Sequence, residues 1–525
     1  MRDIPTNTAF FHVNALTRGR KPFTIRNGNE NHTERGPLTV TDTVPKIKAA
    51  WEVHNDRLLL QCMFLWAAAL LLAVPAAATI NREWGTLPAD LFRILTSPSK
   101  LVTDYFAIGS LSAALLNAGL CGLACAVLML FSHIDPDARA LAGFFLVVAH
   151  CFYGLNLLNM WPPFIGVLLF CLVTRRRFAD EVHTAMFATS LGPFISDFLF
   201  RYTLGDAYVF DQPQVTPAGI LLALAFGIAS GFVIPALLPG TTKMHRGYNL
   251  YKAGLAIGLF GTFVYALMYR TFGVSDPVPP TRDNPDYIEK GSSYGEFMVT
   301  FFLVMLLGMI LLGFLLNGKS FRHYTRLLQS SGLDTDFSEK FGTPLCMINI
   351  GVYGLCILTY MTLVILISDG AGFTGPTAGV IIAALTFSAS GQTPRNVWPI
   401  VLGYTLFRGF CAAVTAAVGG DVTWTLSTQG YINGLAFATG LCPFSGKYGW
   451  KIGTIAGFAD AIICTSTSAM HGGFVLYNGG FAAGLTALLL IPILDYYNVP
   501  LRRQDEPPAL SPEEQSVILE VIGRK

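Results

Sequence analysis

A few ionisable side chains lie inside long apolar stretches of the sequence: Asp197, Arg395, Arg408, Lys447 and Asp460. Such a group at the centre of a membrane helix costs about 2.5–3.5 kcal/mol even on a lenient insertion scale, so it usually marks a function. Asp460 could carry a proton or help to bind Na⁺, with Asp197 and Arg408 as further ion-coupling candidates. Arg395 could hold a carboxylate or phosphate through paired hydrogen bonds. The competing interpretation is a structural ion pair of Asp460 with Arg408 or Arg395.

Small polar residues beside Gly and Pro form a second group of candidates, at breaks in the apolar segments. Non-helical backbone at membrane depth survives only inside protein or beside a wet cavity. The broken helices there offer free N–H and C=O groups to a solute or ion. We therefore expect a midplane solute site formed by Asn159, Thr189, Ser190, Gln392, Arg395, Asn396 and Thr439. Alternatively, these residues only allow close helix packing.

The composition shows which class of protein must position these residues. Of the 525 residues, 52% are hydrophobic and only 13% are charged, whereas soluble domains contain about 25% charged residues. This excludes a soluble enzyme and a disordered scaffold, and the net charge of +2 argues against nucleic-acid binding. The ten cysteines lie in or beside apolar runs without the paired spacing of a zinc site, so we expect free thiols and no metal.

Apolar stretches of about 20 residues predict the membrane crossings. Two other regions, 141–174 and 376–418, are broken near the middle, and their first arms are too short to span. They indicate helical hairpins that enter and leave on one side, although two short full spans would give the same parity. The expected crossings are 58–80, 105–131, 183–202, 216–236, 251–269, 297–316, 342–367, 431–446, 451–468 and 478–497.

Basic residues near the segment ends orient the chain, because Lys and Arg favour the cytoplasmic side. They place the tails 1–57 and 501–525 in the cytoplasm and the acidic, Pro-rich linker 273–296 outside. The expected location is the cytoplasmic (inner) membrane of a bacterium. Tyr251 and Tyr477 are expected to be interface anchors, and His245 and His471 to cap the loops before them.

The sequence contains an internal duplication. The Met-His-x-Gly motif at 244–247 recurs at 470–473, and the Asn-x-Trp-Pro motif of the first hairpin break at 159–162 recurs at 396–399. Phe-Ala-Thr recurs at 187–189 and 437–439, and Asn-x-Gly at 117–119 and 349–351. The motifs occur in the same order in both halves, which strongly favours two repeats, 58–272 and 297–500.

The predicted fold is an all-α integral membrane protein with two repeats, each of about five transmembrane helices plus one helical hairpin. An odd number of crossings in each repeat inverts the second copy relative to the first. Inverted repeats are typical of secondary transporters and also occur in channels.

The paired Met-His-x-Gly and Asn-x-Trp-Pro motifs resemble those of a family of bacterial multispanning proteins built from a tandemly duplicated domain of unknown function. The resemblance covers residues 55–500. It implies a duplicated integral membrane protein and assigns no substrate or site. At the level of fold, the scaffold helices with two opposed hairpins also resemble elevator-type secondary transporters.

The favoured function is therefore ion-coupled secondary transport of a small polar or anionic solute, with the hairpins as gates. The alternative is a urea- or formate-like channel formed by two inverted halves. An enzyme is not expected, because no zinc-protease or serine-hydrolase motif lies at a membrane boundary. The expected partners are the lipid bilayer, a solute and possible further copies of the chain, with Na⁺ or H⁺ as coupling ion and no other cofactor.

Overall fold

The structure is a computed structural model that describes residues 57–101, 103–210, 212–277, 293–368, 372–420, 425–502, 506–511 and 514. These residues belong to one unit that spans residues 50–525. The expectations for residues 1–56, for most of the linker 273–296 and for most of the tail 501–525 lie outside the described residues.

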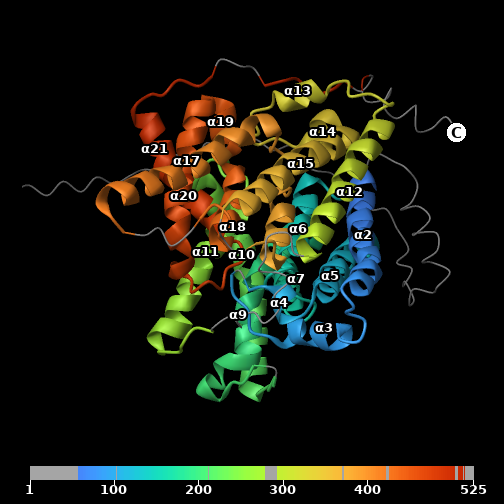
Figure 1. Ribbon diagram of the computed structural model, residues 1–525, viewed down its shortest axis with the longest axis vertical. Helices are drawn as coiled ribbons and strands as arrows, with labels where there is room; N and C mark the ends of the chain where they lie inside the picture. Colours follow the sequence, from blue (N-terminus) through green and yellow to red (C-terminus); the bar gives the residue numbers. More distant parts are fainter. Residues whose placement is uncertain are drawn as a thin grey trace, which may run out of the picture. The chain divides into compact units, whose positions relative to one another are not determined.

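All regular secondary structure among the described residues is helical, and these residues contain no strand (Figure 1). Nine of their helices are long and apolar enough to cross a membrane, and all except α17 match a predicted crossing. The nine are α2 (Leu58–Ile80), α5 (Leu111–Phe131), α10 (Pro217–Met244), α11 (Lys252–Tyr265, continued by the π-helix η5, Ala266–Thr271), α12 (Ser293–Leu316), α15 (Thr343–Ile367), α17 (Pro394–Val418), α20 (Trp450–Met470) and α21 (Asn478–Tyr496).

The two remaining predicted crossings are helices with an irregular middle. In the first half, α8 (Phe178–Ala188), the 3₁₀ turn η2 (Thr189–Leu191), α9 (Gly192–Asp197) and the π-helix η3 (Phe198–Tyr202) follow without a gap. In the second half, α18 (Gln429–Ala438), η7 (Thr439–Leu441) and α19 (Cys442–Tyr448) do the same. Both 3₁₀ turns begin at the Thr of Phe-Ala-Thr and precede a Pro, which cannot donate to the helical ladder.

The two hairpins differ in the length of their second arm. The first consists of α6 (Ala138–His150) and α7 (Trp161–Thr174), both too short to span. The second consists of α16 (Gly375–Ala384) and α17, and α17 has 25 residues. The first arms are short, as expected, whereas the second arm α17 is long enough to span. The capping box at Thr393 and Asn396 starts a helix that continues through Pro399 as far as Val418.

Glycines hold the second arm of each hairpin against a long helix of the same half. A Cβ at Gly231 of α10 would lie 2.0 Å from the carbonyl oxygen of Pro163 in α7. In the second half, a Cβ at Gly457 of α20 would lie 2.1 Å from the carbonyl oxygen of Ile400 in α17. The two halves therefore share the same close crossing, of the kind that small residues permit between membrane helices.

Equivalent helices from the two halves meet in opposite directions. Along the contact between α11 and α21, Gly254 approaches Gly480 while Gly261, farther along α11, approaches Val475, which precedes α21. Equivalent helices that run antiparallel where they touch are what an inverted repeat requires.

Short helices between the first two crossings of each half also link the halves. In the first half these are α3 (Leu87–Thr96) and α4 (Tyr105–Ile108), and in the second α13 (Tyr324–Leu328) and α14 (Phe337–Phe341). Asp104, which caps α4, accepts a hydrogen bond from the N–H of Gly375 at the start of α16 (3.1 Å). Its equivalent Asp336, which caps α14, accepts one from the N–H of Ala138 at the start of α6 (3.4 Å).

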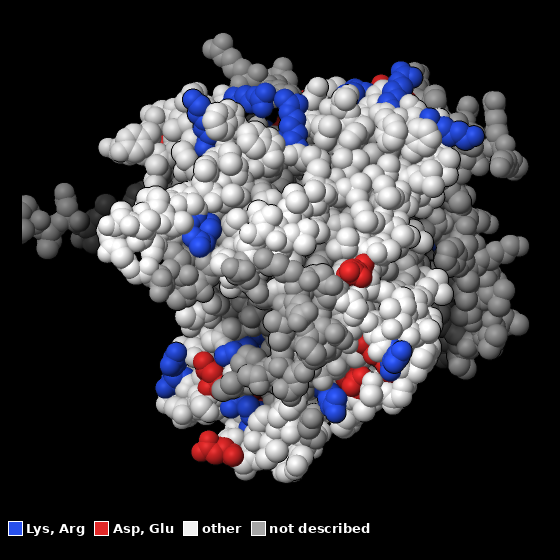
Figure 2. Space-filling view, in the orientation of Figure 1, with Lys and Arg blue, Asp and Glu red and all other residues white. Residues whose placement is uncertain are grey.

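The surface fits a bilayer. On the face shown in Figure 2, Lys and Arg gather along the top edge and charges of both signs lie along the bottom edge. Few charged side chains lie between these two edges. Large apolar side chains of the spanning helices are exposed, among them Leu72, Leu221 and Val304. A soluble protein rarely exposes so much contiguous apolar surface, so these side chains contact lipid.

Candidate functional site

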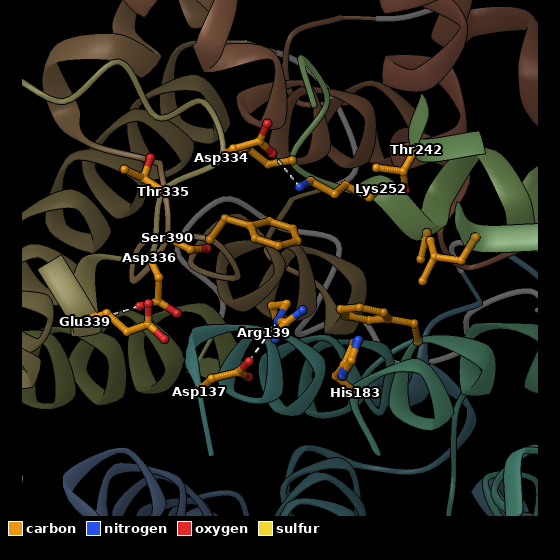
Figure 3. Close-up of a pocket in the computed structure, with 15 residues that line it drawn as sticks. Asp137, Arg139, His183, Thr242, Lys252, Asp334, Thr335, Asp336, Glu339 and Ser390 are labelled. Carbon is orange, nitrogen blue, oxygen red and sulfur yellow. Dashed lines mark hydrogen bonds and ion pairs between the residues drawn. The ribbon is translucent and has the colours of Figure 1, made fainter. Parts of the chain in front are cut away.

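A cavity of about 510 Å³ lies between the two halves, and both halves line it (Figure 3). We call it the vestibule. Its walls come from α6, α8, α10 and the start of α11 in the first half, and from the segment around α14 and the second hairpin tip in the other half. It lies on the face of the loop 317–341, whose Lys319, Arg322 and Arg326 predict a cytoplasmic location, and of the acidic loop 132–140, which the predicted order of crossings places on the same side. Its rim and floor include Asp137, Arg139, His183, Phe187, Lys252, Asp334, Phe387 and Ser390.

The rim of the vestibule is charged and mostly acidic. Lys252 Nζ lies 2.8 Å from Asp334 Oδ1, and Arg139 Nε lies 2.8 Å from Asp137 Oδ2. Partial burial acts to raise the pKa of Asp137, but the Ala140 N–H and the Arg139 guanidinium outweigh it and hold that pKa below its usual value. Carboxylates outnumber cations at the rim, so the vestibule disfavours anions.

The floor of the vestibule is aromatic and leads to the centre of the protein. Phe187 and Phe387 are each 7% exposed. The ring of Tyr251 lies 4.8 Å from that of Phe387 and 5.7 Å from that of Tyr477, and both tyrosines are fully buried. The expectation that these tyrosines anchor the chain at the membrane interface was therefore wrong.

The tyrosines are central because the segment before each of them passes into the other half. The Leu250 N–H donates to the Gly440 carbonyl (2.9 Å) in the broken helix of the second half. The Leu476 N–H donates to the Ser190 carbonyl (3.0 Å) in the broken helix of the first half.

His471 caps its loop as predicted, since its Nδ1 accepts from the Val475 N–H (3.3 Å).

The other face of the protein is closed where this face is open. Aligning the two repeats assigns each vestibule residue an equivalent in the other half. The side chains of Arg139 and Lys252 are 69% and 37% exposed. Their equivalents, Pro376 and Asn478, are buried. The floor residues His183, Phe187, Phe387 and Ser390 correspond to Asn433, Phe437, His150 and Tyr153, each 0–1% exposed.

The side chains of Asn159 and Asn396 form hydrogen bonds inside the hairpin tips. Asn159 Nδ2 donates to the Gly154 carbonyl (2.9 Å) and to Ser196 Oγ (2.8 Å). Asn396 Nδ2 donates to the Gly391 carbonyl (2.8 Å). These equivalent bonds fold each tip onto itself, so both residues shape the breaks, and the amide groups point into the tips.

Among the residues expected at a midplane site, Gln392 and Thr439 are brought together. Gln392 Nε2 donates to Thr439 Oγ1 at 2.6 Å, and the Tyr251 hydroxyl lies 3.5 Å from the same nitrogen. Thr189 and Ser190 instead donate to carbonyls of their own helix, those of Met186 and Phe187. The polar contact near the centre therefore belongs to the second half, where Gln392 replaces Leu155 of the first.

Asn117 and Asn349 position the hairpin tips, a role that the sequence did not reveal. Asn117 Nδ2 donates to the carbonyls of Cys151 and Leu155, and Asn349 Nδ2 donates to the equivalent carbonyls of Ser388 and Gln392 at 2.7 and 2.8 Å. Both asparagines are fully buried on the spanning helices α5 and α15. Their recurrence in the Asn-x-Gly motif, inside an apolar helix, was the signal.

Replacing Asn349 with Ala should leave two buried tip carbonyls without donors, at a cost of about 1–3 kcal/mol. We expect a lower Tm of the purified protein in detergent, and a smaller loss for N349Q, whose longer amide can still donate. The matched variant N117A should behave in the same way. An unchanged Tm in both alanine variants would contradict this role.

Asp197 forms a buried ion pair. Its carboxylate lies 2.6 Å from Arg201 Nε and 2.9 Å from Arg201 Nη2, and it accepts from the Tyr269 hydroxyl at 2.6 Å. Arg201 lies near the end of the predicted crossing 183–202, and its i, i+4 spacing from Asp197 was a signal for the pair. The arrangement neutralises Asp197 locally.

Asp460 is bound by hydroxyls. Tyr404 donates to its Oδ2 (2.8 Å) and Thr486 donates to its Oδ1 (2.9 Å), which joins α17, α20 and α21. Among the described residues no cation forms an ion pair with Asp460, so the predicted pairing with Arg408 or Arg395 was wrong. Arg395 is exposed, and together with Trp398 it lines a second cavity of about 400 Å³. Arg408 is half-buried and lies farther along α17.

The described residues contain no group of three His, Cys, Asp or Glu side chains that could hold a metal ion.

Comparison with known proteins gives one match. A family model described as a protein of unknown function (DUF1576) matches residues 85–270 and again residues 316–496. The two matches coincide with the two repeats. No curated protein and no solved structure matches the chain, so the comparisons lend no support to the resemblance to elevator-type transporters.

Proposed function

The chain belongs to the DUF1576 family, whose model matches both of its halves, and from this duplicated membrane architecture we propose that it is a secondary transporter of a small polar solute. The solute enters the vestibule and crosses by alternating access, in which the two halves exchange conformations around the central tyrosines.

One observation carries this proposal. The vestibule is open on one face, while the equivalent positions on the other face are packed shut. A chain with two copies of one fold can reverse that asymmetry by giving each copy the conformation of the other. The closed centre, where Tyr251 and Tyr477 meet, is what a carrier needs between its two open states.

Asp460 is the proposed coupling site, and H⁺ is the proposed ion. Keeping a buried carboxylate charged without a counter-ion is costly at membrane depth, and a proton removes that cost. Tyr404 and Thr486 connect the carboxylate to the second hairpin and to α21, whose start lies beside Tyr477. Protonation can therefore bias the helices that surround the centre.

Counterflow tests the function. Purified protein in proteoliposomes is loaded with unlabelled solute, and entry of the same radiolabelled solute is followed, with uracil, glucose, alanine, lactate and choline as probes. A carrier should show entry of at least one probe that saturates and accelerates with internal solute. The urea- or formate-like channel of the alternative hypothesis would show a flux that internal solute does not accelerate, and that result would overturn the transporter.

A further inference from the structure

A cluster of polar and aromatic side chains lies on the closed side of the centre. His150 and Tyr153 come from the end of the first hairpin arm, Asn433 and Phe437 from one face of α18, and Tyr477 from the residue before α21. The His150 ring lies 5.4 Å from that of Tyr153, 6.4 Å from that of Phe437 and 6.3 Å from that of Tyr477. We call these five residues the outer cluster.

The polar atoms of the outer cluster are buried without hydrogen bonds. Among the described residues, no group meets hydrogen-bonding geometry with either ring nitrogen of His150, with either amide atom of Asn433 or with the Tyr477 hydroxyl, although the Asn433 amide lies near the Tyr153 hydroxyl of the same cluster. A buried polar atom without a partner costs about 1–3 kcal/mol, so several together are unusual in a folded protein. Such a group is expected where a ligand supplies the missing partners.

Inverted symmetry gives these residues a position in the transport path. His150, Tyr153, Asn433 and Phe437 are equivalent to Phe387, Ser390, His183 and Phe187, and all four of those line the vestibule. Tyr477 is equivalent to Tyr251, which contacts the vestibule floor. When the two halves exchange conformations, the outer cluster therefore becomes the floor of a second vestibule on the opposite face.

We propose that the outer cluster is the solute-binding site in the outward-open state, and that it takes an uncharged solute with a flat face and several hydrogen-bonding groups. This inference rests on the proposed function. The outer cluster presents both donors and acceptors through an imidazole, an amide and a phenol. Its aromatic walls, with the rings of His150 and Phe437 inclined by 21°, suit a planar or ring-shaped molecule.

Charged solutes fit the outer cluster less well. It contains no Lys or Arg to hold an anion and no Asp or Glu to hold a cation. The acidic rim of the vestibule also disfavours anions on the other face. Aromatic rings alone can hold a quaternary ammonium ion, but that ligand would leave His150 and Asn433 unpaired, because it has no N–H or O–H on its charged group.

Thermal unfolding of the purified full-length protein in detergent tests the site without measuring flux. The probes are uracil and glucose as uncharged ring solutes, choline as a cation and lactate as an anion. A ligand that binds the folded state raises the Tm. We expect uracil or glucose to raise the Tm by about 2 °C or more, and choline and lactate to leave it unchanged. A shift with choline or lactate alone, or with none of the four, would overturn the ligand class.

Two variants test the residues. Y477F and N433L each remove unpaired polar atoms with little change in volume, so we expect a Tm equal to or above that of wild type but no response to the uncharged probe. T454V, which removes another buried hydroxyl without a partner among the described residues, should keep the full response. If Y477F and N433L lowered the Tm and kept the response, the cluster would be structural, for example as a site for ordered water.

The inference and the proposed function can fail separately. Suppose that the uncharged probe binds wild type, that the two variants abolish binding, and that proteoliposomes show no counterflow. The binding site would then be supported and the transport function contradicted. If counterflow is intact in Y477F and N433L, then the transporter stands and this site is wrong.

Discussion

Alanine in place of Gly231 should prevent the protein from folding stably. The new Cβ would lie 2.0 Å from the Pro163 carbonyl oxygen, whereas such a carbon and oxygen approach only to about 3.3–3.6 Å. The helices α10 and α7 would have to separate by more than about 1 Å. Helix association in a membrane depends on close packing, so we expect loss of monodisperse protein on size-exclusion chromatography and a sharply lowered Tm.

The same helices provide matched controls for this prediction. G457A should fail in the same way, because its Cβ would lie 2.1 Å from the Ile400 carbonyl oxygen. Gly240 on α10 and Gly409 on α17 have no atom within 4 Å of a Cβ position, and Ala is favoured over Gly in a helix by about 0.5–1 kcal/mol. G240A and G409A should therefore be as stable as wild type or more stable. Wild-type behaviour of G231A would mean that the close crossing is not formed.

Asparagine in place of Asp460 should abolish uphill uptake driven by a proton gradient. The amide has a similar shape, and its oxygen can accept a hydrogen bond from one of the two hydroxyls while its NH₂ group donates to the other. It cannot gain or lose a proton. We expect gradient-driven accumulation in proteoliposomes to fall to the level without a gradient, while counterflow of the same solute persists. Counterflow that persists without gradient-driven accumulation would show that D460N has lost coupling and not its fold.

The control for D460N is a second neutralisation at membrane depth. The double variant D197N/R201M removes both members of the buried ion pair, and its proton-driven uptake should be reduced no more than its amount of folded protein. D460E should keep part of the coupling, because it keeps a carboxylate. Full gradient-driven accumulation by D460N would rule out Asp460 as the coupling site.

The sequence was sufficient to predict the architecture because two signals are strong and local. Apolar runs of spanning length mark the helices, and motifs such as Met-His-x-Gly mark the duplication. The 3₁₀ turns at Thr189 and Thr439 also fall where Gly and Pro interrupt the apolar pattern. The start of α17 was not predicted, because Trp-Pro at 398–399 reads as a break. The helix instead begins at Pro394, where a first-turn proline is tolerated, and continues through Pro399.

The candidate site was harder to predict because it depends on contacts between distant segments. Tyr251 and Tyr477 stand at helix starts beside loops, a place that favours the membrane interface when only the local sequence is considered. Their burial follows from the hydrogen bonds of Leu250 and Leu476 to the other half, and no local pattern encodes those bonds. The vestibule likewise depends on Asp137 and Asp334, which lie in segments that the topology had treated only as connections.

The exchanged segments around Leu250 and Leu476 also constrain how the protein can be made. The Ser190 carbonyl receives its partner only when the chain has been synthesised as far as Leu476. At roughly 5–20 residues per second, the first half waits on the order of tens of seconds in the membrane with its core incomplete. During that time the first half depends on the insertion machinery or on a chaperone, and ribosomes that stop early leave behind a fragment suited to degradation by membrane proteases.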